Sequence, residues 1–181
     1  MEVTLDNIGQ RADVDRGVAS LYFRSKEELF LRVLREELAD WYSALEIEFE
    51  QASGSFSQSD LAELLAKSLA ERSELTRFLS LEAIVLEQNL DAMEVFRFQR
   101  WRRDRMTTVG ALLENLVEGL DRSEGIRLLH RVQLLTAALQ PAAAPKGAAT
   151  YEVGDPDFDV FKVDFESEMK RFVFAMLGSG S

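Results

Sequence analysis

Hydroxyl and basic side chains that can contact the phosphates and bases of a nucleic-acid duplex lie close together at the start of the chain, between Thr4 and Lys26. Helix-start signals divide this stretch. Thr4 is a suitable N-cap for a first short helix and Asp15 for a second. Ser25, with Glu28 three residues later, forms a capping box before an apolar run. Two short helices joined by a tight turn are typical of a helix-turn-helix unit, whose second helix enters the major groove of DNA.

The same stretch resembles the N-terminal signature of the TetR family of bacterial transcriptional regulators. The most specific part is the run Tyr-Phe-x-Ser-Lys-Glu that begins at Tyr22, because a generic helix-turn-helix unit has no reason to carry it directly after its second helix. The matching positions are Ala12, Val14, Gly17, Tyr22, Phe23, Ser25, Lys26, Glu27 and Leu29. Beyond this motif, the chain resembles the family only as a run of helices of the expected lengths.

This resemblance implies roles for individual residues of the head. Thr4, Tyr22 and Lys26 match family positions that contact phosphates, and residues 16–20 match the reading helix. Val18 can offer only apolar contact, for example to a thymine methyl group. The residues expected to contact DNA are therefore Thr4, Arg16, Gly17, Val18, Ser20, Tyr22 and Lys26.

Two features depart from the family pattern. Family members begin with a further helix behind the reading pair, whereas here the second family helix is expected almost directly after Met1, which predicts an incomplete head. Asp13 and Asp15 occupy a turn that usually holds small or hydroxyl residues, and Ser20 stands where a phosphate-contacting Tyr is common. Carboxylates that face a polyanion oppose binding unless they cap helices and point away. DNA binding is implied by the resemblance but weakened by these departures.

Charge and composition indicate a soluble globular protein with a neutral head and an acidic body. Of 181 residues 46% are hydrophobic, and the net charge of −11 lies wholly outside residues 1–35, which hold as many basic as acidic groups. Such a neutral head on an acidic body fits an anion-facing surface at the N-terminal end. Because cysteine is absent, disulfides and thiolate metal sites are excluded.

Catalytic motifs are also missing from the sequence. No Gly-x-Ser-x-Gly elbow, phosphate-binding glycine loop or His-Glu-x-x-His pair is present, which argues against an enzyme and predicts no metal or cofactor. No signal peptide or bilayer-length apolar run is found, so a cytoplasmic protein without a membrane partner is expected.

Apolar periodicity predicts an all-α fold, with a truncated helix-turn-helix head at residues 1–35, a helical effector-binding and dimerisation body at 36–177 and a flexible tail at 178–181. One long helix is expected from Ser25 to about residue 52, and a shorter one follows. A helix at 75–89 is apolar nearly all round and is expected to be buried on most sides. Three further helices are expected at 91–119, 123–140 and 157–177, with a loop at 141–156 that contains all three prolines.

The body is predicted to hold a small, mainly apolar effector among the helices at 25–52, 73–90 and 91–119. Bulky apolar groups on these helices make either a tight core or an apolar pocket in which Glu82 or Gln88 orients a ligand. The residues expected at this site are Trp41, Phe78, Glu82, Gln88, Met93 and Phe96, with Trp101 nearby.

The last two helices are predicted to form a homodimer interface, since family members dimerise through them. A terminal phenylalanine stripe is usually core, but here apolar residues occupy more than one face of the last helix. The expected interface residues are Leu128, Val132, Leu135, Phe161, Phe165 and Phe172. His130, the only histidine, is expected to be a satisfied interface or core residue rather than a metal ligand.

One basic cluster interrupts the acidic body. It contains Arg97, Arg100, Arg102, Arg103 and Arg105, around Trp101. The favoured interpretation is a solvated helix face that pairs with nearby acidic groups. The alternative is an edge that binds an anion, such as a ligand carboxylate or a phosphate.

Together these observations predict a ligand-responsive, DNA-binding transcriptional regulator that acts as a repressor. A small apolar effector is expected to change the separation of the two reading heads in a dimer and so to release the protein from operator DNA. The alternative is a helical ligand-binding or dimerisation module that does not bind DNA, supported by the incomplete head and the acidic turn.

Overall fold

A computed structural model describes residues 4–11, 18–52, 54–86, 90–118, 120–144 and 156–178. Within these ranges the fold is all-α, apart from an isolated bridge between Phe56 and Val117. The helices are α1 (Leu5–Arg11), α2 (Val18–Tyr22), α3 (Lys26–Glu50), α4 (Gln58–Ala70), α5 (Ser73–Leu86), α6 (Ala92–Leu116), α7 (Glu124–Ala143), the 3₁₀ helix η2 (Pro156–Phe161) and α8 (Phe165–Gly178). In this part of the chain no helix is long and apolar enough to cross a lipid bilayer.

Side-chain caps begin α1 and α3 where the sequence predicts them. Asn7 N–H donates to Thr4 Oγ1 (3.2 Å) and Thr4 N–H donates to Asn7 Oδ1 (3.2 Å) at the start of α1. At the start of α3, Glu28 N–H donates to Ser25 Oγ (3.1 Å). These bonds satisfy amide groups that have no partner inside a helix. The turn between α1 and α2, with Asp13, Asp15, Arg16 and Gly17, lies outside the described residues.

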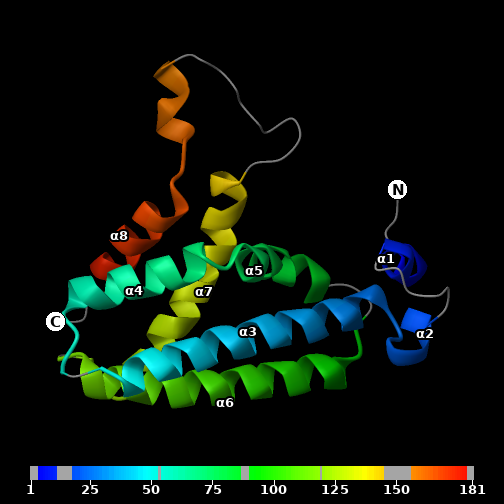
Figure 1. Cartoon of the computed structure of the whole chain (residues 1–181), viewed down its shortest axis with the longest axis horizontal. Helices are drawn as coiled ribbons and strands as arrows, with labels where there is room; N and C mark the ends of the chain where they lie inside the picture. The colour runs from blue at the N-terminus through cyan, green and yellow to red at the C-terminus, as the bar shows by residue number, and fades with distance from the viewer. Residues whose placement is uncertain are drawn as a thin grey trace.

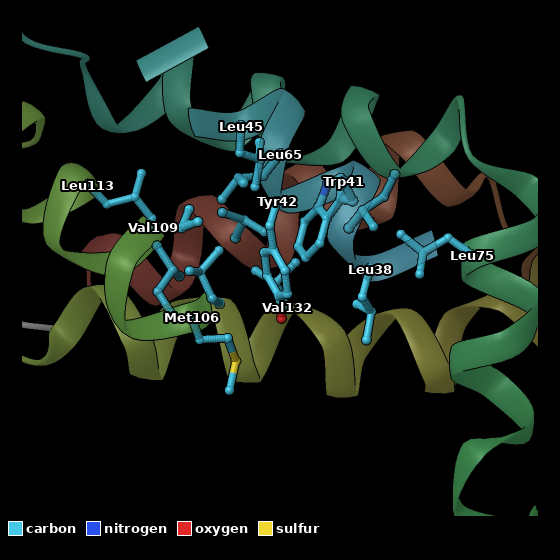
Figure 2. Packing of buried hydrophobic residues seen from close by; sticks show 14 of the residues in the cluster. Leu38, Trp41, Tyr42, Leu45, Leu65, Leu75, Met106, Val109, Leu113 and Val132 are labelled. Carbon is cyan, nitrogen blue, oxygen red and sulfur yellow. The ribbon is translucent and has the colours of Figure 1, made fainter. Parts of the chain in front are cut away.

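The body is arranged around α3, which packs against α6 along its length and against α5. Figure 1 shows α3 and α6 side by side, with α1 and α2 at one end of α3. α7 packs against α6 and α5, while α8 packs mainly against α4. The core comes from every one of these body helices, and Figure 2 shows Leu38, Trp41, Tyr42 and Leu45 of α3 at its centre. α3 is therefore shared by the head and the core.

Helix boundaries near the C-terminal end differ from the prediction. α7 continues through Pro141 to Ala143, where a loop was expected from residue 141. Proline near the end of a helix forfeits one backbone hydrogen bond and otherwise fits helical φ. The last helix begins at Phe165 rather than Asp157, because Asp164 provides the cap: Ser167 N–H donates to Asp164 Oδ1 (2.8 Å). Hydrogen bonds from Ser167 also lower the pKa of the Asp164 carboxyl.

The helix predicted to be buried on most sides is only partly covered. α5 buries one stripe that contains Leu75, Thr76, Leu79 and Glu82. Ile84 on the opposite side is 58% exposed, since α5 packs against α3 and α7 and leaves its outer side uncovered. Apolar composition all round a helix therefore overestimated its burial here.

α6 and α7 approach so closely that two glycines meet at their crossing. A Cβ atom added to Gly125 would lie 2.1 Å from the carbonyl oxygen of Gly110, and one added to Gly110 would lie 2.6 Å from the amide nitrogen of Ile126. Both obstacles are backbone atoms, which cannot move aside as a flexible side chain can. The spacing of the two helices thus depends on the absence of side chains at this crossing.

We expect Gly110→Ala and Gly125→Ala each to lower the free energy of unfolding by about 2 kcal/mol or more, because the added methyl forces the helices apart. Alanine has a higher helix propensity than glycine by about 1 kcal/mol, so the expected loss of stability is net of this favourable contribution. Gly178→Ala is the matched control, since nothing lies within 4 Å of its Cβ position. Urea unfolding of the three variants measures the difference. Equal stability of all three would contradict the role of the crossing.

Candidate functional site

The residues predicted to contact DNA lie on the surface of the head where the structure describes them. Thr4 is exposed at the start of α1, Ser20 is exposed on α2, and Val18 is partly buried there. Tyr22 is 76% exposed, and its neighbour Leu21 is 81% exposed. An exposed leucine and tyrosine on a five-residue helix are suited to contact with another macromolecule. Leu21 was not among the residues predicted to contact DNA, and it lies on α2 one residue before the specific motif.

Lys26 stands at the first residue of α3, immediately after the Ser25 cap. Its Nζ lies 3.8 Å from Oε1 of Glu27, whose side chain is 9% exposed. The amide groups at the start of α3 and the Lys26 ammonium are positively polarised, while Glu27 and Glu28 place two acidic groups in the same turn. Such a helix end can contact a phosphate group.

The residues predicted to contact the effector do not form one cluster. Trp41 is fully buried and its Nε1 donates to Ser68 Oγ of α4 (3.0 Å), so its polar edge points towards α4. Phe78 packs against Phe30, with ring centroids 5.0 Å apart. Met93 and Phe96 are 55% and 58% exposed on α6. Gln88 lies outside the described residues.

Glu82 is the predicted effector residue that the structure places in a polar site within the core. Arg102 Nη1 donates to Glu82 Oε1 (2.5 Å), and Arg102 Nε and Nη2 donate to Gln133 Oε1 (2.8 and 2.5 Å). Gln133 Nε2 then donates to the hydroxyl of Tyr42 (2.7 Å). All four residues are buried. We call this set, Glu82, Arg102, Gln133 and Tyr42, the polar chain; it joins α5, α6, α7 and α3.

The arginine cluster of α6 divides into exposed and buried members. Arg97, Arg100 and Arg103 are exposed, as a solvated helix face requires. Arg102 departs from that interpretation, because it is buried and paired with Glu82. Its position follows from helix geometry: it lies four residues after Phe98 and four before Met106, on the buried stripe. The phase of that stripe is the sequence signal that distinguishes it from its neighbours.

Arg105 of the cluster binds α3, and Arg35 of α3 contacts Trp101 at the centre of the cluster. Arg105 Nη2 donates to Glu46 Oε2 (2.8 Å), and the guanidinium of Arg35 lies 5.0 Å from the ring centroid of Trp101. These contacts fasten α6 to α3 at the molecular surface. They add to the apolar packing between the two helices.

An open groove of 490 Å³ lies between α3 and α4, and none of the predicted effector residues is among those that line it. Acidic groups outnumber basic ones in its lining, which includes Glu48, Glu63, Lys67, Glu71 and Arg72. The groove is exposed and mixed in charge, so it lacks the apolar lining expected of the predicted site.

The predicted interface residues occupy different environments. Leu128 and Val132 are buried in the chain's own core, on α7, which packs against α6, α5 and α8. Leu135 and Phe165 are partly buried against the core, and Phe161 and Phe172 are exposed. The outward side of α7 instead carries His130 and Leu134, the latter 57% exposed, and α8 adds Phe174 at 50%. On α8 the stripe through Met169, Val173 and Leu177 faces the core.

Burial raises the pKa of Tyr42 to about 12, from its ordinary value of 10.0. Figure 2 shows this ring pointing from α3 towards α7. Below pH 10 the hydroxyl is neutral in both the folded and the unfolded chain. Between roughly pH 10 and pH 12 the unfolded chain loses this proton first, so folding becomes less favourable as pH rises.

We therefore expect Tyr42 to account for a loss of about 2 to 3 kcal/mol of unfolding free energy as pH rises through that window. Tyr42→Phe lowers stability at neutral pH, because Gln133 loses a hydrogen-bond acceptor, but its stability should fall less steeply above pH 10. Denaturant unfolding of both proteins as a function of pH measures this. Parallel alkaline losses in the two proteins would exclude Tyr42 as the cause.

Comparison with known proteins finds a family match for both parts of the chain. Residues 1–33 match the family described as bacterial regulatory proteins, tetR family. Residues 35–178 match the family described as tetracyclin repressor-like, C-terminal domain. No curated protein matches the chain. With a helix-turn-helix region at its start and a matching helical body behind it, the chain belongs to the TetR family of bacterial transcriptional regulators.

Proposed function

We propose that the protein is a dimeric repressor that leaves its operator DNA when a small, mainly apolar effector enters the helical body. The observation that carries this proposal is the continuity of α3. This helix of 25 residues begins at the head and buries Leu38, Trp41 and Tyr42 completely in the body core. A change in packing around its buried part must therefore move its head end.

The head is the proposed DNA-binding surface. Ser20, Leu21 and Tyr22 are exposed on α2, and Lys26 begins α3 directly after it. Charge supports the same assignment, since residues 1–35 are neutral while the chain as a whole carries −11. An acidic body is repelled by DNA, which favours an approach through the head.

The outward sides of α7 and α8 are the proposed dimer interface. They expose Leu134 on α7 together with Phe172 and Phe174 on α8. Large apolar side chains that remain exposed on adjacent helices are typical of a surface covered by a partner. A second copy paired through these helices would hold two heads at a fixed separation, which matches the spacing requirement of two operator half-sites.

The effector is proposed to act between α5 and α6, beside α3. Phe78 and Leu86 of α5 and Trp101 of α6 are only partly buried there against the core. Partly buried apolar groups around a polar chain resemble the lining of a ligand site, in which a few polar groups fix the orientation. Tyr42 connects that region to α3 through Gln133.

Lys26→Gln tests the DNA surface. The variant should bind an operator recovered from a random DNA pool more weakly than the unmodified protein, and the slope of log affinity against log salt should fall by about 1, because one phosphate contact is lost. Lys67→Gln on α4 is the control, since Lys67 is similarly basic and lies on the body. Fluorescence anisotropy at several salt concentrations measures both slopes. An unchanged slope for Lys26→Gln would remove this residue from the interface.

Leu134→Asp and Phe174→Asp test the dimer. Each variant should be monomeric, since a charge buried at an apolar interface costs several kcal/mol. Ile47→Asp on α3 is the control, because Ile47 is exposed to a similar extent (53%) on another face. Light scattering gives the mass of each protein. A dimer that survives both α7 and α8 substitutions, or a monomeric unmodified chain, would contradict the proposed interface.

A further inference from the structure

Arg102 is held more firmly than its acidic partner in the polar chain. The guanidinium makes two hydrogen bonds to Gln133 and one to Glu82, and its side chain is 8% exposed. Glu82 accepts one hydrogen bond, from Arg102, within the described part of the chain, and its side chain is 11% exposed. Loss of the Glu82 contact would leave Arg102 anchored to α7. The carboxylate is the exchangeable member of the pair.

The ion pair also spans two helices that pack against the same two neighbours rather than closely against each other. α5 packs mainly against α7 and α3, and α6 packs mainly against α7 and α3 as well. Long side chains, not close backbone approach, connect α5 to α6 at Glu82 and Arg102. A side chain in that position can be replaced by a ligand group of the same charge without separating a close-packed helix pair.

Charge balance determines whether such a ligand should carry a positive or a negative charge. A guanidinium carries a fixed positive charge, and two hydrogen bonds to Gln133 keep Arg102 in the buried site when Glu82 is displaced. A cationic ligand would therefore place two positive charges together in a poorly solvated site. A carboxylate that displaces Glu82 keeps the site neutral and can form the two-pronged pairing that guanidinium groups favour.

The surroundings of Arg102 favour a ligand that is apolar apart from its charged group. The guanidinium carbon lies 5.8 Å from the ring centroid of Phe98, which is 4% exposed. Phe78 and Leu86 lie one helical turn to either side of Glu82 and pack against the core while remaining partly exposed. A ligand carboxylate at Arg102 would thus have apolar side chains on both sides.

We propose that the effector is an apolar carboxylate, alkyl or aryl, whose carboxylate replaces Glu82 as the partner of Arg102. This inference rests on the proposed function, and it adds the chemical class of the ligand. Displaced Glu82 turns to solvent at the edge of the site. The new partner changes the position of Arg102 and, through Gln133, that of Tyr42 on α3. The polar chain is then the connection between ligand and head.

Matched pairs of probes test the charge requirement. Octanoate and 4-phenylbutyrate are compared with octanamide and 4-phenylbutanamide, which have the same shape without the charge. Two measurements are made: the thermal shift of the protein, and the release of a selected operator followed by anisotropy. The unmodified protein should bind each carboxylate about tenfold or more tightly than its amide.

Variants of the pair test the location. Glu82→Gln keeps the shape of the competing side chain but removes its charge, so carboxylate affinity should rise severalfold. Arg102→Gln alone leaves Glu82 buried without its partner and is prone to unfold. The double variant Glu82→Leu with Arg102→Met keeps the core filled with apolar groups and should bind carboxylates and amides equally. Arg105→Gln, which breaks the Arg105–Glu46 pair one turn along α6, should keep the preference.

The outcomes separate the two levels of the proposal. Equal binding of carboxylates and amides by the unmodified protein, no thermal shift from either carboxylate, or a carboxylate preference that persists in the double variant would overturn the assignment to Arg102. Failure of the unliganded protein to select any operator would contradict the proposed repressor instead, while the thermal shift would still decide the carboxylate site.

Discussion

A guanidinium buried among helices must be paired, and this requirement fixes how four helices of the body meet. Arg102 of α6 is 7% exposed, and its partners come from α5 and α7. Removing one partner of a buried pair typically costs about 3 to 5 kcal/mol, whereas an apolar replacement of the whole pair is often neutral. Such a pair is therefore a weak source of stability but a strong constraint on geometry. Gln133 extends the constraint to Tyr42, so that α3 is placed by the same hydrogen bonds as α5, α6 and α7.

This arrangement gives the body one way to act on the head. α3 is continuous through 25 residues, a length of about 37 Å at 1.5 Å per residue. A rigid helix of that length converts a small shift at Tyr42 into a larger displacement at Lys26. The α6–α7 crossing resists movement of these two helices, because the contact between Gly110 and Gly125 leaves no space for adjustment. Movement of α3 is therefore expected on its α5 side, where partly buried groups surround Glu82.

Much of the fold follows from local signals that the sequence displays directly. Thr4, Ser25 and Asp91 were predicted to begin helices, and each accepts the capping hydrogen bond. The all-α class was also confirmed. The end of α7 and the start of α8 were not predicted, because Pro141 is tolerated in a last turn and Asp164 competes successfully with Asp157 as a cap. Those choices depend on tertiary context, not on the local residue types alone.

The site was less predictable than the fold because it depends on the exact rotation of each helix. A phase error of one residue rotates a side chain by about 100°, enough to exchange core and surface. This is why Arg102 was grouped with solvated arginines although it is buried. The signal for Arg102 is present in the stripe through Phe98 and Met106. A basic residue on such a stripe must find a buried acceptor, and α5 offers Glu82 on its own buried stripe. A comparison of the charged residues on the buried stripes of α5 and α6 would therefore have predicted the Glu82–Arg102 pair from the sequence.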